Sequence, residues 1–151
     1  MSARPPRPRV RGASLLVMAG ALVAGVAVFL PWLSGGGETF DGTDTFVTGR
    51  SFADLEIVEA PGYAMLFFAA ALIGLGIALY VAGRVLAVAI LAIVGSAFAL
   101  LMGIGMIAVV DESRDLIGTG TVSFGIGVIL QPIGPTLSLA GSIWATSKRR
   151  R

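Results

Sequence analysis

The chain has 151 residues, of which 56% are hydrophobic and only 13% are charged, and its mean hydropathy is +0.90. A soluble domain carries about 25% charged residues, so this composition excludes an ordinary soluble protein and indicates a lipid environment. The absence of Cys, His and Asn excludes disulfides, thiolate and imidazole metal sites, thiol or histidine catalysis, and N-glycosylation.

Four long apolar segments follow a basic N-terminal head, residues 1–12. They cover residues 13–33, 62–83, 85–110 and 124–146, and none of them contains Asp, Glu, Lys or Arg. A helix rises about 1.5 Å per residue, so each segment can cross a hydrocarbon core of roughly 30 Å. Continuous apolar runs of this length exclude the alternating strands of a membrane β-barrel. The sequence predicts an all-α integral membrane protein, a four-transmembrane-helix bundle over residues 13–146, with a tight hairpin about Gly83 and Arg84.

The distribution of charge predicts the orientation of this bundle. Nine of the eleven basic residues lie on one side of the predicted spans, together with no acidic residue: Arg4, Arg7, Arg9, Arg11, Arg84, Lys148, Arg149, Arg150 and Arg151. The other side carries Arg50, Arg114 and all nine acidic residues. Basic residues near span ends favour the cytoplasm, so we expect both the N-terminus and the basic tail, residues 147–151, to be cytoplasmic.

The basic head is not expected to be a cleaved signal or a nucleic-acid site. The first apolar run ends in Phe29-Leu30-Pro31-Trp32-Leu33, which lacks small residues at the spacing of a signal cleavage site. No aromatic residue for base stacking is interleaved with the arginines. We expect residues 1–12 to be disordered and to lie near anionic lipid headgroups.

The Trp and Tyr residues fall at the ends of the predicted spans. Trp32 and Tyr63 lie at the outer boundary, and Tyr80 and Trp144 lie at the inner one. Their amphipathic rings favour the headgroup level, so all four are predicted to be membrane-interface anchors.

Two external segments remain, residues 34–61 and 111–123. The first opens with a flexible Gly35–Gly37 exit, and its Thr, Phe and Val content predicts a small β-hairpin around Thr48–Ser51. Its Asp41-Gly42-Thr43-Asp44 sequence resembles part of a cation-binding loop. It lacks the later Glu of such loops, so we interpret it as a solvated acidic turn.

Small residues recur every four positions in the spans. Such stripes let helix backbones approach closely in lipid, where the hydrophobic effect does not drive helix association. We expect them to pack the spans against each other or, alternatively, to dock a partner membrane protein. The predicted helix-packing residues are Ala70, Gly74 and Ala78, then Gly95, Ala99 and Gly103, and finally Gly134, Ser138 and Ser142.

The fourth span contains an unusual stretch, Gln131-Pro132-Ile133-Gly134-Pro135. Each proline removes a backbone donor, which predicts a kink, and Gln131 could hydrogen-bond the carbonyls that the prolines free. The alternative is a polar transport site at a broken helix, for which Gln131 is the speculative candidate.

Catalysis and metal binding have little support in the sequence. All acidic residues lie outside the apolar spans, and nothing selects a catalytic pair among them. Ion-coupled transport usually requires ionisable residues inside the membrane, and the predicted spans contain none. We therefore expect no enzymatic activity, no catalytic residue, no metal site and no cofactor.

The pattern Phe29-Leu30-Pro31-Trp32-Leu33-Ser34-Gly35 resembles small four-helix membrane proteins of actinobacteria, which are mostly uncharacterised. Their last span is similar to the outline formed here by Gly125, Gly127, Leu130, Gly134, Gly141, Ser142, Lys148 and Arg149. This resemblance implies architecture and a bacterial lineage, and the excess of Arg over Lys agrees with a GC-rich bacterial genome. A large first loop also resembles claudin-type proteins, whose Trp and Cys signature this chain lacks.

These observations predict a multi-pass protein of the bacterial plasma membrane. We expect a non-enzymatic accessory or scaffold protein that contacts a partner membrane protein, or a second copy of itself, through small-residue helix faces and the first external loop. One alternative is a small transporter or channel that uses the kinked fourth span. Another is an extracytoplasmic sensor that binds a ligand or cation through the acidic loop.

Overall fold

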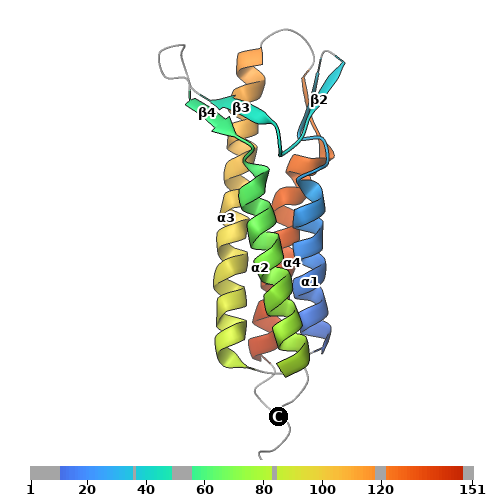
Figure 1. The fold of residues 1–151 in the computed structure, drawn as a ribbon, viewed down its shortest axis with the longest axis vertical. Coiled ribbons are helices and arrows are strands. Elements are labelled where there is room, and N and C mark those ends of the chain that lie inside the picture. The colour runs from blue at the N-terminus through green and yellow to red at the C-terminus, as the bar shows by residue number, and fades with distance from the viewer. Residues whose placement is uncertain (1–10, 36, 49–55, 83–84, 118–121, 148–151) are drawn as a thin grey trace, which may run out of the picture.

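The structure is a computed structural model that describes residues 11–35, 37–48, 56–82, 85–117 and 122–147. Four helices run antiparallel to their neighbours, and short strands form a cap at one end of the bundle (Figure 1). The helices are α1 (Arg11–Ala27), α2 (Gly62–Ala82), α3 (Leu86–Ile117) and α4 (Ile126–Ser147). Each helix packs against the next in sequence, and α4 closes the ring against α1. The predicted helical bundle is thus present.

Three helices, α2, α3 and α4, are long and apolar enough to cross a membrane. Their surfaces carry many exposed apolar side chains, among them Phe67, Val81, Val94 and Leu101. Lipid tails solvate such side chains, so a surface of this kind is typical of a multi-pass membrane protein.

Helix α3 extends seven residues beyond the predicted span end at Val110. Its 32 residues correspond to about 48 Å, which exceeds a hydrocarbon core of roughly 30 Å. The added residues begin with Asp111 and Glu112, both exposed, and the next Gly or Pro in the sequence is Gly118. A helix can continue past the end of an apolar run when no Gly or Pro interrupts it. The length of the apolar run is therefore shorter than the length of α3.

Helix α1 is shorter than its predicted span, residues 13–33, because it ends at Ala27 after 17 residues. Backbone hydrogen bonds between residues three apart follow, from Phe29 N to Val26 O (3.1 Å) and from Leu30 N to Ala27 O (3.4 Å). Pro31 then disfavours helical backbone at Leu30 and lacks an N–H of its own. The last residues of the apolar run belong to the cap instead.

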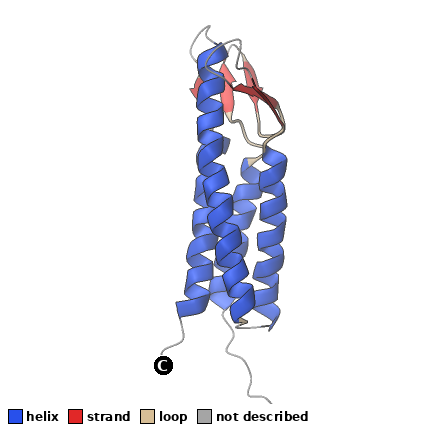
Figure 2. Ribbon diagram, turned by 90° about the vertical axis from the view of Figure 1, so that its left-hand side faces the viewer, coloured by secondary structure: helices blue, strands red, loops and turns tan. Residues whose placement is uncertain are grey.

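The cap contains two small sheets (Figure 2). One has strand order β2-β1-β5 and is built from β1 (Leu33–Gly35), β2 (Glu38–Phe40) and β5 (Ser123–Phe124). The other is the hairpin of β3 (Thr45–Thr48) and β4 (Glu56–Glu59), which confirms the predicted hairpin; residues 49–55 lie outside the described residues. The expected flexible exit is instead a strand end and turn, since Gly35 pairs with Glu38 and Gly37 has a φ of +87° that suits glycine.

A hydrophobic cluster joins the cap to the adjacent end of the bundle. Its buried members are Trp32, Leu33, Phe46, Met106, Val110 and Val128. The rings of Trp32 and Phe46 lie 5.8 Å apart, which joins the β3 strand to the start of β1. The cap therefore shares one core with α3 and α4. The end of α3 beyond Val110 lies beside the cap.

Candidate functional site

Trp32 is buried at the junction between the end of α1 and the cap, which corrects its predicted role as a membrane-interface anchor. Its side chain is 0% exposed, and its indole Nε1–H donates a 2.9 Å hydrogen bond to the carbonyl of Ala27. That carbonyl belongs to the last residue of α1, where helical partners run out. The ring therefore lies inside the protein, where α1 ends.

Three backbone N–H groups donate hydrogen bonds to the carbonyls at this junction. Gly42 N donates to Val28 O (2.8 Å), Gly125 N donates to Trp32 O (2.8 Å), and Gly127 N donates to Pro31 O (2.8 Å). Since these donors come from the first loop and from the start of α4, both of these parts of the chain hold the end of α1.

The acidic turn, Asp41–Asp44, is part of the same junction. Asp41 Oδ1 accepts from Thr43 N (2.8 Å) and from Thr43 Oγ1 (2.7 Å), and Asp44 Oδ2 accepts from Asp41 N (2.8 Å). Gly62 N at the start of α2 donates to Gly42 O at 2.7 Å. The carboxylates of Asp41 and Asp44 therefore stabilise a turn in the segment that connects α1 to α2. Among the described residues no group of three or more acidic side chains is placed to hold a metal ion.

The closest helix seam lies between α1 and α4, and its glycines recur every seven residues. A Cβ on Gly134 would lie 2.6 Å from both Ala24 N and Gly20 O, and a Cβ on Gly141 would lie 2.8 Å from Ala13 O. A Cβ on Gly127 would lie 2.8 Å from Ala27 O. Only glycine permits such backbone contact. The predicted four-residue stripe contains Gly134, whereas Gly127 and Gly141 follow a seven-residue spacing.

The predicted stripes on α3 and α4 face the inside of the bundle. Ala99 is buried, Gly103 lies against the backbone of Gln131, and a Cβ on Gly95 would lie 3.5 Å from Leu72. Ser138 and Ser142 are buried on α4, where Ser138 Oγ donates to Val17 O of α1 at 2.9 Å. The α3 and α4 stripes contribute to contacts within this one chain.

The stripe on α2 lies on the outside, so of the two stated alternatives, packing within the bundle does not apply to it. Ala70 and Gly74 are exposed, Ala78 is half-buried, and a Cβ on Gly74 would meet no described atom within 4 Å. Beside it runs an open apolar groove of about 270 Å³ between α1 and α2. The groove is lined mainly by Ala21, Gly25, Phe29, Leu66, Ala70 and Ile73.

Gln131 is buried without a hydrogen-bond partner. Its Oε1 and Nε2 meet no donor or acceptor in the part of the chain that the structure describes, and the same holds for Ser96 Oγ on α3. Helix α4 continues through Pro132 and Pro135 without a break. Pro135 lacks the N–H that would bond to the carbonyl oxygen of Gln131. The backbone of α3 at Gly103 packs against this oxygen. The side chain of Gln131, which was expected to bond to such freed carbonyls, does not do so among the described residues.

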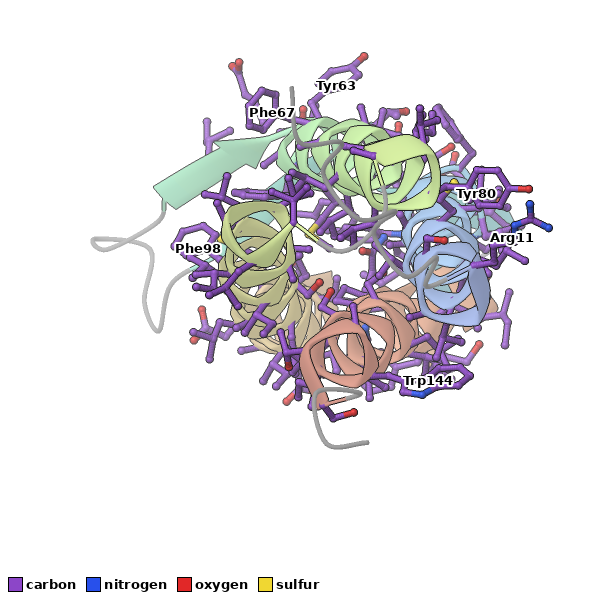
Figure 3. All side chains as sticks on the ribbon, turned by 90° about the horizontal axis from the view of Figure 1, so that it is seen from below. Arg11, Tyr63, Phe67, Tyr80, Phe98 and Trp144 are labelled. Atoms are coloured by element: carbon purple, nitrogen blue, oxygen red, sulfur yellow. The ribbon has the colours of Figure 1, made fainter. Side chains whose placement is uncertain are left out.

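The other three predicted anchors are exposed near helix ends. Tyr63 lies near the cap end of α2, and Tyr80 and Trp144 lie near the ends of α2 and α4 that are farthest from the cap. All three side chains are labelled in Figure 3. Tyr63 and Tyr80 are 17 residues apart on one helix, or about 26 Å along its axis. This separation is close to the thickness of a hydrocarbon core, roughly 30 Å.

No protein-family model matches the chain, and no curated protein is significantly similar to it.

Proposed function

We propose that α1 is a fourth transmembrane span, so that the chain crosses the bacterial plasma membrane four times. Its 17 residues correspond to about 26 Å, the same length that separates Tyr63 from Tyr80. Its backbone lies against α4 at the three glycine positions along the seam, from Gly127 to Gly141. A helix so closely paired with a candidate span shares its depth in the membrane.

Both termini are then cytoplasmic. The first described residue of α1 and the last of α4 lie at the same end of the bundle, opposite the cap (Figure 1). The nine-to-two distribution of basic residues supports this end as the cytoplasmic one. The cap lies on the external side.

The function that the geometry supports best is that of a non-enzymatic accessory or scaffold protein. The observation that carries this proposal is the outward position of the α2 stripe, with Ala70 and Gly74 exposed beside the α1–α2 groove. The equivalent stripes on α3 and α4 face the bundle, so among these three described stripes the one on α2 offers a surface that admits a further helix at close range. The occupant is a helix of a partner membrane protein or of a second copy.

The cap supplies a second contact surface. Ile57 on β4 is 65% exposed, and it belongs to a hairpin that projects from the outer end of the bundle. An apolar side chain on an external surface, outside lipid, is a common anchor of protein contacts.

A transporter is the second candidate, supported by the buried and unpartnered carboxamide of Gln131. Such a side chain could bind a polar substrate at the level of the α3–α4 contact. The continuous α4 helix counts against it, because transporter sites of this kind use unwound backbone.

The decisive test replaces Gly74 with Leu. A Cβ at Gly74 meets no described atom within 4 Å, so Gly74→Leu leaves the monomer intact and blocks a helix that docks on α2. Gly105→Leu is the matched control, since Gly105 on α3 is open in the same way. We expect Gly74→Leu to abolish co-purification of the partner, or self-association, from mild-detergent extracts, while Gly105→Leu retains it. Equal association of both variants with the wild type would remove α2 as the contact face.

The cap is tested by Ile57→Glu, with Thr45→Glu as its control. Both side chains are exposed on the β3–β4 hairpin, but only Ile57 is apolar. We expect Ile57→Glu to weaken association and Thr45→Glu to leave it unchanged, measured by the same co-purification. A transporter would behave differently, because reconstituted wild-type protein would show a flux that depends on Gln131.

A further inference from the structure

Arg11 and Tyr80 lie close together at the end of the bundle opposite the cap, which is the inner end in the proposed topology. Arg11, the first described residue of α1, is exposed, and its guanidinium carbon lies 5.9 Å from the centroid of the Tyr80 ring. Tyr80 is 41% exposed near the end of α2. A cation within about 6 Å of an aromatic face is attracted to it, so the ring holds Arg11 at the level of the helix ends.

Trp144 of α4 completes this inner rim, which we define as Arg11, Tyr80 and Trp144. The Trp144 ring lies against Gly12, where a Cβ would be only 3.1 Å from the ring, and the side chain is 43% exposed. Glycine next to Arg11 thus makes room for the indole. The three rim side chains come from three helices, and they point outward from the bundle when it is seen from the inner end (Figure 3).

Apolar side chains lie one helical turn deeper. Leu15 follows Arg11 by four residues and is exposed on α1, and Ile77 precedes Tyr80 by three residues and is exposed on α2. A cation and aromatic rings above an apolar surface match the order of headgroup and acyl chain in a phospholipid.

The charge at this end favours an anionic lipid. The segments that begin or end here carry nine basic residues and no acidic one, and Arg11 is the member whose side chain the structure describes. A guanidinium presents a planar fork that binds two phosphate oxygens through parallel hydrogen bonds, whereas an ammonium group acts as a point charge.

We propose that the inner rim binds the headgroup phosphate of an anionic phospholipid, with the Arg11 guanidinium as the direct contact. Tyr80 fixes the orientation of Arg11, and Leu15 and Ile77 lie along the acyl chains. The placement of the rim in the inner leaflet rests on the proposed topology, whereas the binding itself does not depend on which leaflet is inner.

Native mass spectrometry of the full chain in mild detergent tests this proposal, with equimolar phosphatidylglycerol and phosphatidylcholine of identical chains. We expect the wild type to retain phosphatidylglycerol about fivefold more than phosphatidylcholine, the ratio expected for one basic group near an anionic headgroup. Arg11→Gln should abolish that preference. Arg151→Gln removes the same charge from the tail and should keep it.

Two further variants keep the test decisive if Arg11→Gln is poorly folded. Arg11→Lys retains the charge without the fork and should lower the preference, while Tyr80→Phe retains the ring and should preserve it. Equal losses in Arg11→Gln and Arg151→Gln, or no lipid preference in the wild type, would overturn the proposal in favour of diffuse charge attraction. Displacement of the lipid by millimolar inorganic phosphate would also overturn it, since the site would then recognise phosphate alone.

The result is separable from the proposed scaffold role. Arg11→Gln leaves the α2 stripe unchanged, so it should still co-purify the partner, whereas Gly74→Leu should lose the partner and keep the lipid. Failure of one property with survival of the other identifies which proposal is wrong.

Discussion

The indole Nε1–H of Trp32 donates a hydrogen bond of 2.9 Å to the carbonyl oxygen of Ala27, the last residue of α1. A helix that ends in a buried place needs donors for its final carbonyls. Here a side chain five residues further along the chain supplies one of them, and the same ring packs on Phe46 of the cap. One residue therefore ends a helix and joins the bundle to its cap.

We predict that Trp32→Phe lowers the free energy of unfolding by about 2 kcal/mol. The change removes this donor from the Ala27 carbonyl, which keeps the 3.4 Å bond from Leu30 N, at a cost of about 1 kcal/mol. The smaller ring also leaves a cavity in the buried cluster. Trp144→Phe is the matched control, because Trp144 is exposed and should change stability by less than about 0.5 kcal/mol. Unfolding in detergent, followed by circular dichroism, measures both, and equal losses would contradict the assigned role of Trp32.

The same residue shows what the sequence could and could not predict. Apolar runs without charge locate α2 and α4 within two residues and the start of α3 within one, because crossing lipid requires continuous apolar helix. They do not separate Trp32 in a headgroup region from Trp32 in a protein core, since both positions suit an amphipathic ring at a span end. That distinction depends on the loops folding back over the helix end, which is a tertiary event.

Helix packing was likewise only partly predictable. Four-residue stripes occur on three spans, but the pattern does not tell which of them face the bundle, so the sequence leaves open both packing and docking for Gly74, which lies outside. The α1–α4 seam was missed because its glycines, Gly127, Gly134 and Gly141, recur every seven residues. A seven-residue repeat keeps one seam in register between two helices and was the available signal.

We next predict opposite effects for two glycines of α3. A Cβ at Gly103 would lie 2.9 Å from Gln131 O, so Gly103→Ala forces two backbones apart and should cost about 1–3 kcal/mol. Gly105 has no described atom near its Cβ position, and Gly105→Ala should be neutral or stabilise by about 0.5–1 kcal/mol through helix propensity. Thermal unfolding of the two variants compares them directly. Similar melting temperatures would mean that α3 and α4 are not in close contact there.

Gln131→Met should stabilise the protein by about 1 kcal/mol. The carboxamide is fully buried and lacks a partner among the described residues, so the apolar and similarly long Met removes a desolvation penalty. Ser138→Ala is the contrasting control, because Ser138 Oγ bonds to Val17 O and its loss should cost about 0.6 kcal/mol. If Gln131→Met is as destabilising as Ser138→Ala, the carboxamide has a partner in the membrane, and the transport alternative gains support.

The final prediction concerns the number of spans. The chain has no cysteine, so single-Cys variants can be labelled without background. Cys at Thr39, exposed on β2, should react with an impermeant thiol reagent in intact cells, whereas Cys at Ser2 and at Ser147 should react only after permeabilisation. Labelling of Ser2 and Thr39 from the same side would show that α1 does not cross and that the chain has three spans. Labelling of Ser2 and Ser147 alone in intact cells would keep four spans and reverse the orientation, since the basic ends would then be external, against the positive-inside rule.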